Sequence, residues 1–237
     1  MALPKLSNDR PIYEMVIPST KETVKYRPFL VKEQKSLLVA FESQDQKQIL
    51  NSMLVCIESC VPGVDVKKLA TFDVDYMFTQ VRSKSVGETS TVLSACTECN
   101  EENEVKINLA DIVVNTDGLK SEVIPINDDV SVEMKYPTYE DTLSYTQREI
   151  SNNAADNLFN SIATCINSVQ TKEENILLKH EPKEEVETFI NSLTNQQLEK
   201  ITGFVDNIPT LIHEQKYNCS KCGHENNLSM KGLQDFF

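Results

Sequence analysis

The sequence predicts an α+β fold, and three observations support this prediction. Two C-x-x-C motifs, CTEC at residues 96–99 and CSKC at residues 219–222, are each followed by alternating apolar and polar residues, as in a β-hairpin strand. Helical periodicity governs several stretches before and between the motifs. Two such cysteine hairpins form a zinc ribbon when they face each other. We therefore expect an N-terminal β-hairpin plus helices, a zinc ribbon built from two distant C-x-x-C knuckles, and a helical insertion between them.

The N-terminal part should begin with a hairpin. Strand-like residues 13–17 and 24–26 flank the turn sequence PSTK. Three helices should follow, over residues 30–43, 45–61 and 73–83. The apolar side chains expected on their buried faces are Leu30, Leu37, Leu38 and Phe41 in the first, Ile49, Leu50, Met53, Leu54 and Ile57 in the second, and Phe72, Tyr76, Met77, Phe78 and Val81 in the third.

The two cysteine motifs are local copies of each other. When CTECNEENEVKI (96–107) is aligned with CSKCGHENNLSM (219–230), the cysteines, a Glu-Asn pair and the alternating apolar positions coincide. Asn100 and Gly223, which follow the second cysteine of each motif, readily adopt the left-handed backbone that such a turn uses. The incoming strands should be residues 91–95 and 211–218.

A C-x-x-C turn presents two thiolates to one ion, and zinc prefers four such ligands in a tetrahedron. The sequence therefore predicts one structural Zn²⁺ per chain, with Cys96, Cys99, Cys219 and Cys222 as its ligands. A catalytic zinc site would leave one position open, whereas four thiolates close the coordination shell. His224 is a conceivable substitute ligand beside Cys222, but we expect it to face solvent.

Two other uses of the cysteines are less consistent with the sequence. A thioredoxin-like redox pair opens a helix in a βαβ unit, and no helical pattern follows either motif. Disulfides are typical of secreted proteins, and residues 1–20 lack the apolar segment of a secretory signal. Cys56, Cys60 and Cys165 lie in apolar surroundings, so we expect them to be buried and reduced.

The 119 residues between Cys99 and Cys219 must leave the ribbon and return to it. They should contain a hairpin around Asn127-Asp128, a helical region over residues 141–169 with a break at Asn152-Asn153, and a helix after Pro182. Residues 174–180 (ENILLKH) fit a strand or a helix equally well. Thr194 and Gln197 form a capping box for a last helix over residues 195–205.

Three domains follow from this order of elements. They comprise residues 1–88 (hairpin and helices), residues 89–120 with 208–237 (zinc ribbon), and residues 121–207 (hairpin and helical insertion). The C-terminal GLQDFF either docks on the core or inserts into a partner.

The charge distribution disfavours nucleic-acid binding. The net charge is −13, and because residues 1–70 carry ten basic and eight acidic residues, the remainder carries −15. A protein that neutralises phosphates needs a basic surface instead. The acidic portion suits a basic partner surface or serves solubility, and the sequence supports both equally. No apolar run is long enough to span a membrane.

No catalytic motif is present, so we do not expect an enzyme. The six glycines are scattered and form no phosphate-binding loop, and neither G-x-S-x-G nor H-E-x-x-H occurs. The acidic pairs Asp73/Asp75 and Asp128/Asp129 should be solvated helix or turn residues and not a carboxylate dyad.

Several stretches carry a family resemblance. VKYRPFLVKEQKSLLVA (24–40), FDVDYMFTQVRSKSVGE (72–88), the C-x-x-C that follows and MKYP (134–137) resemble the baseplate protein family of T-even-type contractile-tailed bacteriophages, described as hub or hub-assembly subunits. The resemblance implies a structural or assembly subunit of the central hub, located in the virion tail baseplate and assembled in the host cytoplasm. Its partners would be other baseplate or tail proteins.

Only the four motif cysteines are carried over from this resemblance, as zinc ligands. Two alternative functions remain open: a zinc-ribbon nucleic-acid-binding or regulatory protein, and an assembly chaperone absent from the mature virion. The sequence does not predict an oligomeric state.

Overall fold

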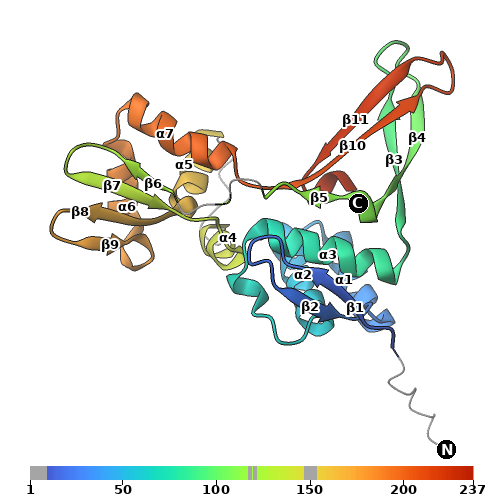
Figure 1. The fold of residues 1–237 in the computed structure, drawn as a ribbon, viewed down its shortest axis with the longest axis horizontal. Coiled ribbons are helices and arrows are strands. Elements are labelled where there is room, and N and C mark those ends of the chain that lie inside the picture. The colour runs from blue at the N-terminus through green and yellow to red at the C-terminus, as the bar shows by residue number, and fades with distance from the viewer. Residues whose placement is uncertain (1–9, 117–118, 120–121, 147–153, 237) are drawn as a thin grey trace, which may run out of the picture. The chain divides into compact units, whose positions relative to one another are not determined.

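The computed structural model describes residues 10–116, 119, 122–146 and 154–236 and combines helices with antiparallel sheets, which confirms the predicted α+β class (Figure 1). The chain forms two compact units. The first comprises Met1–Val66, Phe72–Asn115 and Thr210–Phe237, and the second comprises Lys67–Thr71 and Thr116–Pro209. None of the helices within the described residues has both the length and the hydropathy required to cross a membrane.

The first unit begins with the predicted hairpin and helices. Strands β1 (Tyr13–Val16) and β2 (Thr23–Tyr26) pair antiparallel, and α1 (Val31–Ser43), α2 (Gln46–Cys60) and α3 (Thr71–Ser85) follow. The side chain of Asp45 caps α2 by accepting hydrogen bonds from the backbone N–H groups of Lys47 and Gln48.

The buried faces of α2 and α3 agree with the sequence pattern, and that of α1 does not. Met53, Leu54 and Ile57 of α2 are buried, as are Phe72, Met77, Phe78 and Val81 of α3. In α1, Leu37 is buried as predicted, but Leu38 and Phe41 are 55% and 44% exposed.

Glu33 and Ala40 complete the buried stripe of α1 in place of Leu38 and Phe41. Glu33 tolerates burial because its carboxylate accepts hydrogen bonds from the N–H of Leu30 at 2.7 Å and from the guanidinium of Arg27 at 3.0 Å. Glu33 therefore occupies a buried position that a search for apolar residues at helical spacing does not find.

Asp73 also differs from the prediction that it is solvated. Its side chain is fully buried at the start of α3, where it accepts hydrogen bonds from Ser19. An isolated buried carboxylate is costly, but this one has donors, so it anchors the turn of the N-terminal hairpin.

Two hairpins form the ribbon of the first unit, as predicted (Figure 1). One pairs β3 (Thr89–Ala95) with β4 (Glu102–Asn108), and the other pairs β10 (Leu211–Asn218) with β11 (Glu225–Lys231). The short β5 (Val113–Val114) adds to the free edge of β10. The apolar cluster at the base of the ribbon contains Ile107, Leu109, Ile112, Leu211 and Met230. Leu233 of the C-terminal segment packs against this cluster, so that part of the tail docks on the chain's own core.

The second unit contains a sheet of four antiparallel strands in the order β6-β7-β8-β9. The strands are β6 (Val123–Pro125), β7 (Val130–Met134), β8 (Ile166–Thr171) and β9 (Asn175–Leu177), and the helices are α4 (Tyr139–Thr146), α5 (Ala154–Cys165), α6 (Lys183–Asn191) and α7 (Asn195–Asp206). Residues of β6, β7, β8, α5, α6 and α7 share one apolar core, which includes Ile124, Val132, Met134, Ile162, Ile166, Ile190, Ile201 and Phe204.

The predicted helical region over residues 141–169 is wrong at its C-terminal end. The spacing of Ile162 and Ile166 continues the helical pattern, yet α5 ends at Cys165 and the next residues pair between β7 and β9 as β8. The predicted break at Asn152-Asn153 lies outside the described residues. The segment ENILLKH combines both alternatives, since β9 is followed by a 3₁₀ turn over Leu178–His180.

The predicted turn and capping signals of the second unit are confirmed. The side chain of Asn127 closes the β6–β7 turn by accepting hydrogen bonds from the N–H groups of Asp129 and Val130. Thr194 and Gln197 form the capping box of α7, with the N–H of Thr194 donating to the Gln197 side chain at 2.8 Å.

Candidate metal centre

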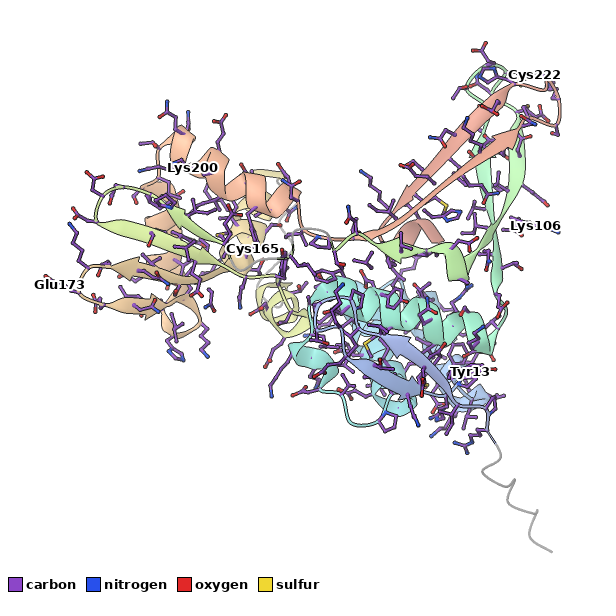
Figure 2. All side chains as sticks on the ribbon, viewed as in Figure 1. Tyr13, Lys106, Cys165, Glu173, Lys200 and Cys222 are labelled. Carbon is purple, nitrogen blue, oxygen red and sulfur yellow. The ribbon has the colours of Figure 1, made fainter. Side chains whose placement is uncertain are left out.

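Four cysteines meet where the turns of the two ribbon hairpins come together. The sulfur atoms of Cys96, Cys99, Cys219 and Cys222 all lie within 4.8 Å of one another, and Figure 2 labels Cys222 in this turn region. Across the hairpins, Cys96 Sγ lies 3.7 Å from Cys222 Sγ, and Cys99 Sγ lies 3.6 Å from Cys219 Sγ.

These separations fit a metal ion better than they fit disulfides. Four sulfurs placed 2.3 Å from a tetrahedral zinc ion lie about 3.8 Å apart, whereas a disulfide joins its sulfurs at about 2.05 Å. All four cysteines are free. Each C-x-x-C motif lies between two strands and opens no helix, unlike the redox motif. The arrangement is therefore a potential metal site.

The two turns have the same backbone geometry, as their shared sequence predicts. The residue after the second cysteine is left-handed in both, with φ of 56° at Asn100 and 75° at Gly223. The N–H of Asn100 donates to the carbonyl of Cys96 at 2.9 Å, and the N–H of Gly223 donates to the carbonyl of Cys219 at 3.0 Å. These bonds hold each pair of thiols on the same side of its turn.

Backbone N–H groups favour the thiolate form of the first cysteine in each motif. The N–H groups of Cys222 and Lys221 lower the pKa of Cys219 to about 6. Burial raises the pKa of Cys96, but the N–H groups of Cys99 and Glu98 outweigh burial and lower it. Because thiolates are the form that binds metal, these donors prepare the two sulfurs for a cation.

The pKa of the second cysteine in each motif is raised, in contrast to that of the first. The N–H of Glu101 lowers the pKa of Cys99, but burial and the neighbouring thiols outweigh it and raise the pKa to about 12. The pKa of Cys222 is also raised: the N–H of His224 lowers it, and burial with the thiols of Cys219 and Cys96 outweighs that effect. A bound divalent cation would favour the thiolate form of all four cysteines.

Two asparagines that the sequence pattern did not single out support the cysteines. Asn226 of β11 accepts hydrogen bonds from both the backbone N–H and the hydroxyl of Thr97, each at 3.0 Å, and its amide Nδ2 lies 3.5 Å from Cys96 Sγ. Thr97 belongs to the other hairpin, 129 residues earlier in the chain. Asn226 thus holds the turn that carries Cys96 and Cys99.

Asn103 of β4 repeats this arrangement in the opposite direction. It accepts hydrogen bonds from the N–H of Ser220 at 2.8 Å and from its hydroxyl at 2.9 Å, and its Nδ2 lies 3.7 Å from Cys219 Sγ. In the sequence, the only indication of these two asparagines was the Glu-Asn pair that the two aligned motifs share. It could have been recognised as a supporting contact only once the hairpins were known to face each other.

Among the described residues, the four cysteines are the only group of three or more His, Cys, Asp or Glu side chains arranged to hold a metal. His224 is exposed, as predicted, and does not belong to the group. Cys56, Cys60 and Cys165 are buried, also as predicted.

Comparison with known proteins agrees with the resemblance of the sequence to phage baseplate proteins. A family model described as T4 bacteriophage base plate protein matches residues 10–237, nearly the whole chain. No curated protein and no solved structure matches the chain. On the extent of the family match, the chain belongs to the T4 bacteriophage base plate protein family.

Proposed function

We propose that this protein is a structural or assembly subunit of the central hub of a contractile-tail baseplate and acts through contacts with other baseplate or tail proteins. The observation that carries this proposal is the family match over residues 10–237. A subunit of this kind requires binding surfaces and a stable fold, and it requires no active site, so we propose a non-enzymatic role.

We further propose that Cys96, Cys99, Cys219 and Cys222 hold one structural zinc ion. Four sulfurs within 4.8 Å supply the closed thiolate shell of a structural site. The ion would join two segments separated by 119 residues. Assembly in the reducing host cytoplasm would keep the thiols available. Iron also accepts four thiolates, so elemental analysis of protein purified under reducing conditions must identify the metal.

Cross-linking mass spectrometry of purified virions tests the hub assignment. A hub subunit should be present in every particle and should cross-link to proteins near the tail axis. Cross-links confined to peripheral baseplate proteins would contradict the hub assignment while leaving a baseplate role intact.

The same experiment separates a subunit from an assembly chaperone. A chaperone would be required for tail formation and missing from finished particles. The nucleic-acid-binding alternative predicts salt-sensitive binding to DNA or RNA, which the net charge of −13 disfavours.

A further inference from the structure

The tip of the ribbon is held by two sets of groups, the four thiols and the pair Asn103 and Asn226. We propose that these two asparagines form a reciprocal latch that closes the ribbon without the metal, so that the ion enters a preformed site. The latch rests on the proposed function only for the identity of the ion.

Both asparagines are buried, with 6% of Asn103 and 4% of Asn226 exposed. The oxygen of each side chain accepts two hydrogen bonds from the opposite hairpin. The Nδ2 of each donates within its own turn, from Asn103 to the carbonyl of Glu101 at 2.8 Å and from Asn226 to the carbonyl of His224 at 3.0 Å. Because a buried amide is costly when unpaired, only the closed ribbon satisfies both side chains while they remain buried.

Other contacts also keep the hairpins together without the ion. The hydroxyl of Tyr217 in β10 donates to Ser94 Oγ in β3 at 3.0 Å, and the Gln215 side chain donates to the carbonyl of Lys106 at 3.2 Å. The apolar cluster at the base of the ribbon joins the same two hairpins. Small zinc fingers unfold without metal because they lack such support. The ribbon has support at its base, its middle and its tip.

Because each asparagine bonds the turn of the opposite hairpin, the effect of replacing it should appear in that opposite hairpin. Asn226 lies in the C-terminal hairpin and holds the N–H of Thr97, whereas Asn103 lies in the N-terminal hairpin and holds the N–H of Ser220. Replacing either asparagine should therefore loosen the cysteine turn of the other hairpin, more than 100 residues away, and leave its own turn less affected.

Amide hydrogen exchange of the full chain, after metal removal by a chelator under reducing conditions, tests the latch. In the wild-type protein, the N–H groups of Thr97 and Ser220 should stay protected after chelation. Asn226→Ala should accelerate exchange at Thr97 by about tenfold, and Asn103→Ala should do the same at Ser220, since each loses one buried acceptor. Asn227→Ala, an exposed neighbour in the same strand, is the matched control and should change neither amide.

The outcomes separate the latch from the zinc proposal. If chelation alone removes protection at Thr97 and Ser220 in the wild-type protein, the metal closes the ribbon and the latch is overturned. If purified protein holds no metal yet both amides are protected, the latch stands and the zinc proposal fails. This arm needs no substitution, so misfolding of a variant cannot obscure it.

A second readout uses metal release to a chelator. The supporting contacts of a metal ligand typically contribute 10- to 100-fold in affinity. The double variant Asn103→Ala/Asn226→Ala should therefore release its metal about 10- to 100-fold faster than the wild type or Asn227→Ala. Equal release rates in all three proteins would contradict a role of the asparagines at the site.

Discussion

The hydroxyl of Ser19 lies 2.6 Å from one carboxylate oxygen of Asp73, and the backbone N–H of Ser19 donates to the other oxygen at 2.9 Å. The two residues are 54 positions apart, and Asp73 is completely buried. The contact joins the turn of the β1–β2 hairpin to the first turn of α3, where a negative charge is also favoured by the helix dipole. A charged side chain thus connects two elements that neither hydrophobic pattern would bring together.

Asp73→Ala should destabilise the first unit by about 1–3 kcal/mol, because both donors of the half-buried Ser19 lose their acceptor. Differential scanning calorimetry should record a lower melting temperature for that unit. Glu58→Ala, which removes an exposed carboxylate from α2, is the control and should have little effect. Equal effects of the two substitutions would mean that the contact with Ser19 contributes no stability.

Metal removal should lower the melting temperature of the first unit and leave that of the second unit unchanged, because all four thiols belong to the first unit. Protein purified under reducing conditions should contain one metal ion per chain, and a strong chelator should lower the transition by about 5–10 °C. Elemental analysis and calorimetry before and after chelation check this prediction. A second-unit transition that shifts by the same amount would show that the effect is not local to the ribbon.

Cys222→Ser should abolish stoichiometric metal binding while allowing the chain to fold. Cys222 is exposed, so the substitution leaves no cavity, yet it removes one of four sulfur donors. We expect the affinity to fall by more than about 100-fold, beyond the usual effect of a supporting residue. Lys221→Ser is the matched control in the same turn, because it removes the exposed ion pair with Glu101 and leaves all four sulfur donors in place. A metal competition assay should separate the two variants.

The second unit should lose stability in acid through Asp141. Burial raises the pKa of this carboxyl, but Lys135 and the N–H of Thr138 outweigh burial and hold the pKa below its ordinary value of 3.8. A lowered folded-state pKa means that the stabilisation is complete above the unfolded value and disappears as the pH falls through the folded value. The contribution should therefore be present at pH 7 and lost below pH 3.8.

Asp141→Asn should cost the second unit about 1 kcal/mol at pH 7, because the ion pair with Lys135 is lost. The difference in unfolding free energy between variant and wild type should shrink as the pH is lowered. Urea unfolding at pH 7 and below pH 3.8 measures this difference. Glu140→Gln is the control, since Glu140 is the exposed neighbour in α4. A difference that is independent of pH would exclude the carboxylate charge as its cause.

The local signals of the sequence determined most of the elements and the members of the candidate site. The spacing and repetition of the two C-x-x-C motifs identified all four cysteines, because a tight turn and its two ligands lie within five residues. The capping box at Thr194 and the turn at Asn127 were predictable for the same reason. Each of these features is encoded by residues that are adjacent in the chain.

Tertiary contacts decided the features that depend on distant partners. Residues 166–169 continue the helical pattern of the sequence, yet they belong to β8, which pairs between two strands of the second unit. Glu33 and Asp73 are polar and still buried, because Arg27 and Ser19 supply hydrogen bonds. Asn103 and Asn226 became recognisable as supports of the candidate metal site only when the hairpins faced each other. Such roles depend on satisfying a buried polar group, and the group that satisfies it has no fixed spacing in the sequence.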